Sequence, residues 1–369
     1  MKSDQNTMSK SIKQIQKFVA RSLAESQVWI NSSTYYHSDQ LLRIILNAAL
    51  DRTSIEDICS STPKSPSPDT VMTMLAKTHC NTSRDKIEDK IAGLFQSQAK
   101  HHVMFKRRTP PKVMLTIDFH DEEYYGKHLY DGPLRLTMFS QRKRRNALRF
   151  ATLSIVFAEN TWSYPLTIGF VINHLGQERI EVVKRLLKQI NLPMRIDCLL
   201  MDGGFNDEKI FEYLDSKKIN FIVRGRISKK KRYPGKVGSN FAYKTGRSKY
   251  LVEAYLFSKR GKDGKLKFIL LLGSKHYRYT IPKVKSIYRK RFRIENTYRH
   301  ARVVKIRTST SKIQLRWIMW AFAHFLELIW ELIRYVFLIQ DLPMYQCRQK
   351  QFVRIVQEQL SKFLSFRLM

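Results

Sequence analysis

Acidic residues and cysteines are both scarce in this chain of 369 residues. Aspartate and glutamate together number 31 against 67 lysines and arginines, which leaves a formal net charge of +36. So many positive side chains repel one another in the folded chain unless a polyanion binds along them. The closely spaced phosphates of a nucleic acid supply the negative charge. The four cysteines include no Cys-x-x-Cys pair and the N-terminus shows no secretory segment. We therefore expect a cytoplasmic, nucleic-acid-binding protein without a disulfide framework.

A long apolar run free of charges is also missing. The most apolar stretch, residues 317–340, contains His324, Glu327, Glu331 and Arg334 in its interior. Each charge near the centre of a bilayer costs about 2.5–3.5 kcal/mol, so this stretch predicts a buried helix and no membrane partner. A hydrophobic content of 43% supplies a sizeable core and argues against a short ribosomal or chromatin-like basic protein.

Residues 1–110 have helical periodicity with polar breaks, and we interpret them as a helical DNA-binding or dimerisation region. A short helix from Ser54 to Cys59, a Pro/Ser break and a second helix capped by Asp69 resemble a helix-turn-helix. The break is longer than the usual tight turn, so a plain helical bundle that packs or dimerises is an equal alternative.

Strand signals begin after a basic linker. The remaining chain predicts an α/β fold, more specifically an α+β mixed sheet, with helices on the faces of the sheet. The predicted order of elements over residues 111–227 is β-β-β-α-β-α-β. A β-rich insertion then covers 228–284, helices cover 285–340, and a basic helical tail covers 341–369. The predicted strands and helices are strands 113–118, 148–158, 164–172, 194–202 and 220–226, and helices 177–190 and 207–218.

Two aspartates follow apolar strand patterns. Asp118 ends the first predicted strand and Asp202 ends the fourth, and each is followed by turn-like sequence. If these strands are neighbours, their carboxylates face one another at one edge of the core and can share divalent metal. Taken singly, either aspartate is more simply explained as the cap of a turn.

A third carboxylate is expected on a basic helix. Tyr288, Arg291, Glu295 and Arg302 are separated by three, four and seven positions, which places them on one helical stripe. The simpler alternative is that Glu295 pairs with Arg291 and Arg299 at helical spacing.

Glu327 and Glu331 are rivals for this role, but their apolar setting lacks arginines for DNA phosphates. Three carboxylates with two magnesium or manganese ions suit phosphodiester chemistry. The two ions activate a water or a 3′-hydroxyl and stabilise the leaving oxygen, while hard oxygen ligands disfavour zinc.

The motif around Glu295 resembles that of insertion-sequence transposases with a DDE triad. The family signature is Y-x2-R-x3-E-x6-K, and the chain has Tyr288, Arg291 and Glu295 at its first three positions. Arg302 stands where the family has lysine. Arginine keeps the charge but not the geometry of lysine, and Lys305 is a possible substitute.

The segments around the aspartates are similar to the same family. MDGGFND contains Asp202, and TIDFHDEEYYG contains Asp118. The resemblance covers residues 111–340 and implies a ribonuclease H-like core with Asp118, Asp202 and Glu295 as catalytic and metal-binding residues. It further implies a prokaryotic, nucleoid-associated enzyme and a homodimer that joins two transposon ends. Its DNA partners would be terminal inverted repeats and target DNA.

Basic residues beside this motif and in two dense runs are the predicted DNA contacts. As charge runs, the two clusters are equally consistent with solvated faces. The predicted DNA-binding residues are Tyr288, Arg291, Arg299, Arg302, Lys305, Lys229, Lys230, Lys231, Arg232, Arg142, Lys143, Arg144 and Arg145.

The sequence thus predicts a DNA transposase that hydrolyses phosphodiesters at transposon ends and transfers the freed strand into target DNA. One alternative is a ribonuclease H-like nuclease without transfer activity, although such an enzyme needs neither the helical N-terminal region nor the insertion. Another is a non-catalytic, domesticated DNA-binding relative in which the carboxylates are structural.

Overall fold

The structure is a computed structural model of the chain. It describes residues 21–22, 25, 29–79, 83–106, 108–124, 137–140, 145–156, 165–173, 177–227, 237–245, 250–260, 264–276, 279–339, 353 and 356. The chain divides into two compact units, which we call the helical unit (residues 1–106 and 297–369) and the sheet unit (residues 107–296).

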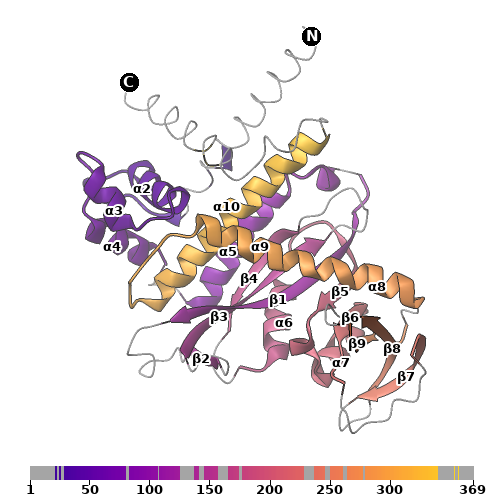
Figure 1. Ribbon diagram of the computed structural model, residues 1–369. Helices are drawn as coiled ribbons and strands as arrows, with labels where there is room; N and C mark the ends of the chain where they lie inside the picture. Colours follow the sequence, from indigo (N-terminus) through magenta and orange to yellow (C-terminus); the bar gives the residue numbers. More distant parts are fainter. Residues whose placement is uncertain are drawn as a thin grey trace. The chain divides into compact units, whose positions relative to one another are not determined.

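The sheet unit is built on a mixed sheet of nine strands (Figure 1). Its central strand β1 pairs antiparallel with β3 on one side and parallel with β5 on the other. β3 also pairs antiparallel with β4, and β5 pairs parallel with β6, which gives the order β4-β3-β1-β5-β6. The bounds of these strands are β1 Lys112–Tyr124, β2 Thr137–Ser140, β3 Arg145–Val156, β4 Leu166–Ile172, β5 Arg195–Met201 and β6 Phe221–Arg224.

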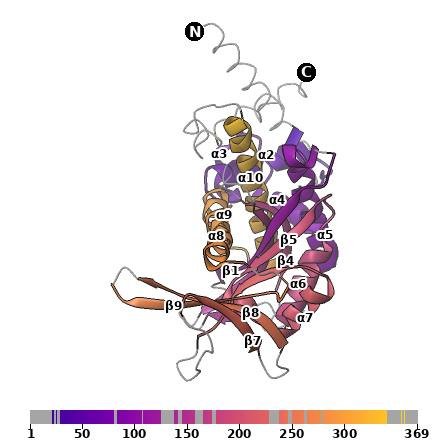
Figure 2. The ribbon, with the colours of Figure 1, turned by 90° about the vertical axis from the view of Figure 1, so that its right-hand side faces the viewer.

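Helices cover both faces of this sheet. α6 (Arg179–Lys188) and α7 (Glu208–Ser216) lie on one face, and α8 (Ile281–Arg289) lies on the other (Figure 2). Each of the three buries one apolar stripe and leaves charged residues outside, which is the pattern of a helix packed on a sheet. Because both faces are covered, every residue of β4 is buried, and its sequence is a continuous apolar run.

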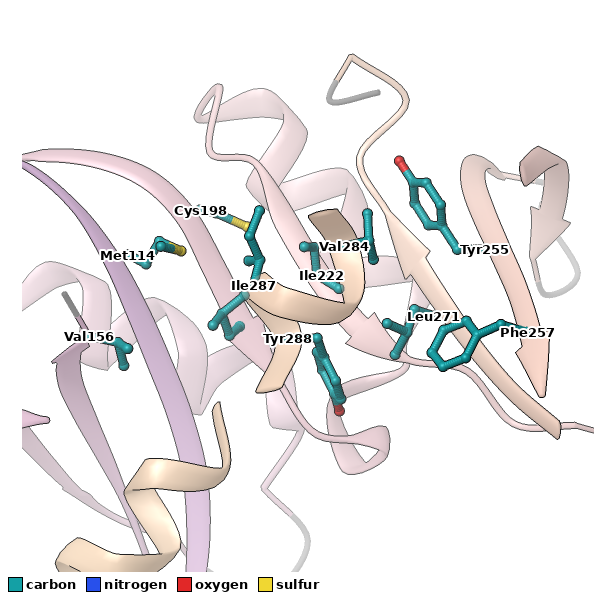
Figure 3. Close-up of a cluster of buried hydrophobic side chains, with 11 residues drawn as sticks. Met114, Val156, Cys198, Ile222, Tyr255, Phe257, Leu271, Val284, Ile287 and Tyr288 are labelled. Atoms are coloured by element: carbon teal, nitrogen blue, oxygen red, sulfur yellow. The ribbon is translucent and has the colours of Figure 1, made fainter. Parts of the chain in front are cut away.

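A cluster of buried side chains fixes α8 on the sheet (Figure 3). Val284, Ile287 and Tyr288 of α8 belong to the same cluster as residues of β1, β5, β6 and β9. Burying a large apolar side chain contributes about 1.5–3 kcal/mol, so this cluster holds the helix in a defined place. The remaining members of the cluster are Met114, Val156, Cys198, Leu200, Ile222, Tyr255, Phe257 and Leu271.

The expected β-rich insertion contains three antiparallel strands, β7 (Ser239–Thr245), β8 (Tyr250–Arg260) and β9 (Leu266–Gly273). It is joined to the main sheet, because β9 pairs with β6 over Ile222–Arg224. The far end of the hairpin projects beyond that pairing and carries exposed apolar side chains, Leu266 at 62% and Phe268 at 50% exposure.

The helical unit is organised around α10 (Ile313–Ile339), whose side chains are almost all buried up to Ile333. α4 (Pro68–His79) and α5 (Arg84–Ala99) pack on α10, and Trp29 makes edge-to-face contacts with Phe322 and Phe325. The other elements of this unit are α2 (Ser38–Leu50), α3 (Ile55–Ser61), the short turns η2 (Val103–Lys106) and η5 (Arg302–Val304), and the last residues of α9 (Arg293–Ala301).

Residues 317–339 of the apolar stretch 317–340 form most of α10. It is a core helix, as expected, and its polar residues His324, Glu327 and Glu331 are buried. Among the described residues, we find no helix with the length and apolarity that crossing a bilayer requires.

The N-terminal helices follow the expected pattern with one correction. Helices form at 38–50, 55–61 and 84–99. Ser54 caps α3: its hydroxyl accepts the backbone N–H of Asp57, and the Asp57 carboxylate accepts the backbone N–H of Ser54. The sequence predicted Asp69 as the cap of α4, and this was wrong. The helix begins at Pro68, two residues before the expected first residue Thr70, and the hydroxyl of Ser67 accepts the N–H of Thr70. Proline suits the first helical turn because a backbone N–H has no acceptor within the helix there, so its absence in proline costs nothing.

Helical periodicity between 285 and 340 also needs a correction. Short 3₁₀ segments separate α8, α9 and the following residues, and 305–312 are not helical before α10 starts. α8 starts at Ile281, earlier than expected, because Pro282 is accommodated in its first turn.

Candidate active site

Asp118 and Asp202 lie side by side at the point where the parallel pairing of β1 and β5 ends. The last paired residues are Ile117 and Met201, and each aspartate is the next residue along its strand. β5 ends at Met201, one residue before the predicted end, and Asp202 follows it directly. Asp118 does not end its strand, because β1 continues to Tyr124 through antiparallel pairing with β3, and Asp118 itself pairs with Thr152.

The continuation of β1 explains why the sequence misled at Asp118. The segment DFHDEEY looks like a turn, since acidic residues are poor strand formers. A bidentate ion pair between Arg149 of β3 and Asp121 of β1, with N···O distances of 2.6 and 2.7 Å, holds the part of β1 that follows Asp118 in place. Tertiary pairing therefore outweighs the local preference of the sequence.

A tight turn after β5 fixes the carboxylate of Asp202. Its Oδ1 accepts the backbone N–H of Gly204 at 2.8 Å and caps η3 (Gly203–Phe205). A Cβ at position 204 would lie 2.8 Å from that same oxygen, so any larger residue there would force the Asp202 carboxylate to shift. Phe205 stacks face to face on Phe119, with ring centroids 4.6 Å apart, which ties the turn to the residue after Asp118.

The helical segment α8–η4–α9 brings a third carboxylate to the two aspartates. Arg291 in η4 (Lys290–Phe292) donates from Nη1 to Oδ2 of Asp118 at 3.0 Å and from Nη2 to Oε1 of Glu295 at 3.2 Å. One guanidinium therefore bridges carboxylates that are 177 positions apart in sequence (295 − 118). Asp118 and Arg291 are both nearly buried, whereas half of the Glu295 side chain is exposed.

Tyr288 holds the end of β5 next to Asp202. Its hydroxyl donates to the backbone carbonyl of Met201, the residue before Asp202, at 3.2 Å. Burial raises the pKa of the Tyr288 phenol to about 12, so the proton needed for this bond stays in place. Each residue of the motif therefore has its own role. Tyr288 holds the end of β5 before Asp202, Arg291 bridges Asp118 and Glu295, and Glu295 supplies the third carboxylate.

The electrostatics of the site call for added positive charge. Burial raises the pKa of Asp118 to about 7, the carboxylates of Asp202 and Glu295 act in the same direction, and Arg291 opposes them. Arg291 is itself buried, which disfavours its charge, but Tyr288 and the three carboxylates outweigh this and raise its pKa. When all three carboxylates are ionised, the single guanidinium leaves an excess of negative charge at the site, and Asp118 carries its share of that charge in a buried position.

This donor set fits hard divalent cations, because carboxylate oxygens are the ligands that Mg²⁺ and Mn²⁺ prefer. Asp118, Asp202 and Glu295 would hold such ions. In the structure the guanidinium of Arg291 lies among these carboxylates and supplies part of the positive charge.

The other predicted DNA contacts are only partly described. Arg299, Arg302 and Lys305 belong to the helical unit, where the ammonium of Lys305 lies over the ring of Trp320 at 4.7 Å. The runs 229–232 and 142–144 lie outside the described residues, as does the side chain of Arg145. Tyr288 and Arg291 are nearly buried, so their role in touching DNA stays a prediction.

Three supporting residues were not identified from the sequence alone. Phe119, next to Asp118, stacks on Phe205 in the turn that follows Asp202, and Phe292 is a large aromatic residue, 44% exposed, packed against the guanidinium of Arg291 at 4.7 Å. A signal for the first two was present, because each phenylalanine lies within three residues of an aspartate. Phe292 carried no such signal, since its exposure depends on the tertiary packing of η4.

The strand order around the two neighbouring aspartates defines the fold. A sheet ordered β4-β3-β1-β5-β6, with its first three strands antiparallel and the last two parallel to β1, is the ribonuclease H-like arrangement. Residues 166–326 match the family described as the transposase DDE domain, a span that includes Asp202 and Glu295 and starts after Asp118. Over this span the chain is similar to transposases of the DDE class.

A solved structure agrees with this fold. The chain is similar to piggyBac transposase in a cryo-EM structure of its synaptic complex with hairpin DNA. The TM-score is 0.54 at 14% identity, over 97% of this chain and 79% of that chain. At this identity the likeness shows the fold alone. No curated protein matches the sequence.

Proposed function

We propose that this chain is a DNA transposase of the DDE class, that Asp118, Asp202 and Glu295 are its catalytic carboxylates, and that they hold two Mg²⁺ or Mn²⁺ ions. The single observation that carries the proposal is the bridge made by Arg291, which joins Asp118 to Glu295 beside the strand end that carries Asp202. Bound ions would activate the attacking water or 3′-hydroxyl and offset charge on the leaving oxygen.

The residues of the chain prepare the site for that chemistry. Arg291 favours the ionised form of Asp118 in a buried position and orients Glu295. The backbone N–H of Phe119 donates to Asp118 at 3.0 Å, and that of Gly204 donates to Asp202 at 2.8 Å. Preorganised groups of this kind lower the barrier because they need no rearrangement during the reaction.

We further propose that the substrate is DNA: the terminal inverted repeats of the element, and then target DNA. The net charge of +36 supports a polyanionic partner, and the similar piggyBac structure is a complex with hairpin DNA. Two ends must be joined in one event, so we propose a homodimer in the DNA complex.

The proposal is tested by incubating purified protein with Mg²⁺ and duplex DNA that carries the ends of the element. Wild-type protein is expected to nick at the ends and to join the freed 3′ end to target DNA, and Asp202→Asn is expected to abolish both products. Asp207→Asn is the matched control. Asp207 caps α7 outside the site, and asparagine caps a helix as well as aspartate does.

Other results would favour the other candidate functions. Nicks that persist in Asp202→Asn would remove that residue from the catalytic set. Nicking without joined products would indicate a nuclease without transfer activity. A wild-type chain that binds DNA but takes up no divalent metal in calorimetry would be a non-catalytic DNA-binding relative.

A further inference from the structure

A second group of metal-ligating side chains lies in the helical unit. His300 is in the last turn of α9, and Glu327 and Glu331 are one turn apart on α10. One ligand atom from each of the three residues can be chosen so that all lie within 4.8 Å of one another. In the part of the chain that the structure describes, no other set of three such residues meets this distance.

Glu327 is the unusual member of the group. It is 1% exposed, and neither of its carboxylate oxygens has a hydrogen-bond partner among the described residues. Burying a carboxylate without a partner is among the most costly events in folding, so native proteins neutralise such a group by a proton, a cation or a metal. A helix interior is an unfavourable place for this residue unless something binds it.

The neighbouring charges do not meet that need. Glu331 is fully buried; its Oε1 accepts from Arg334 at 3.2 Å and lies 3.6 Å from Nδ1 of His300, while its Oε2 has no hydrogen-bond partner in the described chain. Arg334 contributes a single positive charge beside two buried carboxylates.

The surroundings favour a built site over a solvated cluster. The ring of Trp330 packs edge-to-face on His300 at 4.7 Å, and Arg334 lies over the same indole at 5.0 Å. One turn before Glu327, the ring of His324 is buried between Tyr298 and Trp320. Such apolar packing fixes side-chain rotamers and keeps water out, and both effects strengthen ligand binding by an ion.

We propose that His300, Glu327 and Glu331 form a structural site for a divalent transition-metal ion of the Zn²⁺ or Mn²⁺ class. An imidazole nitrogen with two carboxylates is a mixed nitrogen and oxygen donor set, which suits these ions better than Mg²⁺. The ion would tie the last turn of α9 to α10. α9 also carries Glu295, so the ion restrains the helix that supplies the third carboxylate.

The competing way to neutralise this cluster is a proton shared by the two carboxyl groups. Burial raises the pKa of Glu327 and of Glu331, which favours that state in the absence of an ion. The two accounts predict different behaviour toward added metal. The proposal does not depend on the transposase chemistry, because none of its ligands belongs to the Asp118, Asp202 and Glu295 set.

The experiment uses the full chain with Asp118→Asn and Asp202→Asn, so that the catalytic carboxylates do not take up the ion. Metal-free protein of this background is titrated with Co²⁺, followed by its visible absorption, and then with Zn²⁺, followed by thermal unfolding. We expect one Co²⁺ per chain, displaced by Zn²⁺, and a rise in unfolding midpoint of at least about 4 °C with excess Zn²⁺.

Adding Glu327→Gln to this background should weaken Co²⁺ binding at least tenfold and remove the Zn²⁺-dependent rise. Glutamine keeps the volume of glutamate and relieves the buried charge, so the fold is expected to survive. His300→Gln, at a partly exposed position, is the second variant should Glu327→Gln fail to fold. His276→Gln, on an exposed histidine of the sheet unit, is the control and should change nothing.

The proposal is overturned if the background protein shows no Zn²⁺-dependent rise, or if the rise is the same in Glu327→Gln or His300→Gln. A metal-free Glu327→Gln protein that is more stable than its parent, in a chain insensitive to Zn²⁺, would assign the cluster to a shared proton.

Discussion

Arg291 is the residue on which the geometry of the candidate active site depends. It contacts Asp118 and Glu295 with two different nitrogens of one planar group, and it opposes the burial that would otherwise protonate Asp118. Lysine has one compact ammonium group and cannot reproduce two directed bonds. The identity of the side chain matters here as much as its charge.

Arg291→Lys is therefore expected to fold but to lower the rate of end cleavage. Removing one charge-assisted hydrogen bond costs about 1.5–3 kcal/mol, or roughly 10- to 100-fold in rate. The rate of nicking on DNA with the element's ends measures this effect. Arg289→Lys, on the exposed side of α8, is the control and should cleave as wild type does. Equal rates for the two variants would show that the bridge plays no part in cleavage.

Asp118 predicts a pH dependence of stability in the metal-free chain. Its folded-state pKa is about 7, above the ordinary value of 3.8, because the group is buried. A raised pKa stabilises the fold below the unfolded-state value, and that stability is lost as pH rises through the folded-state value. From pH 4 to 7 the wild type should lose roughly 3 kcal/mol relative to Asp118→Asn.

Denaturant unfolding of both proteins across that range, without metal, measures the difference. Added Mn²⁺ should restore wild-type stability at pH 7 and leave Asp118→Asn unchanged, since an ion binds the ionised carboxylate. A difference between the two proteins that stays constant from pH 4 to pH 7 would contradict the raised pKa.

At the scale of elements, the turn between β5 and α7 decides where Asp202 points. η3 starts at Gly203, directly after the strand, and its cap is the side chain of Asp202 itself. The same carboxylate thus follows a strand, caps a turn and faces Asp118. Close approach of the backbone N–H of Gly204 makes this possible, because no Cβ intervenes.

Gly204→Ala should displace the Asp202 carboxylate, since the added Cβ would lie 2.8 Å from Oδ1. We expect the free energy of unfolding to fall by about 1 kcal/mol, the usual value of a cap, together with weaker end cleavage. Gly93→Ala is the opposite case. It lies inside α5 with no described atom within 4 Å of the added Cβ, so it should gain up to about 1 kcal/mol. Chemical denaturation of both variants tests the contrast, which disappears if the Gly204 turn can relax.

At the scale of the whole molecule, charge is the dominant property. A net charge of +36 over 369 residues predicts DNA affinity that falls steeply with salt. Several of the carboxylates lie in buried sites, so they do little to offset the basic residues at the surface. The dense runs 142–145 and 229–232 stay the predicted places of phosphate contact.

Replacing Lys229, Lys230, Lys231 and Arg232 by glutamine should reduce the salt slope of DNA binding by about 0.9 for each phosphate that the protein no longer touches. Binding titrations between 50 and 200 mM salt, roughly the range in which such interactions weaken, measure the slope. Replacing Lys217, Lys218, Lys265 and Lys267, four exposed residues elsewhere in the sheet unit, removes the same number of charges and controls for net charge alone. A slope that is unchanged by the fourfold replacement would place this run in solvent.

Local patterns in the sequence predicted the main elements because their causes are local. Runs of apolar and β-branched residues marked the strands around residues 148–156 and 166–172, and a continuous apolar run ending on Asp202 marked β5. Helical spacing placed Tyr288, Arg291 and Glu295 on one stripe, and the charges within 317–340 argued against a membrane span. The ribonuclease H-like fold followed from the resemblance of these motifs to a known family.

Tertiary packing decided what local patterns could not. β1 runs past Asp118 because β3 pairs with it, and acidic residues stay extended there against their own preference. Arg291 meets Asp118 because an apolar cluster seats α8 on the sheet, 173 positions away in the chain. Glu327 is buried beside His300 because α10 is a core helix. The sequence by itself determined the elements and the three candidate carboxylates, whereas contacts between distant segments, each worth little until all are made, determined how those carboxylates meet.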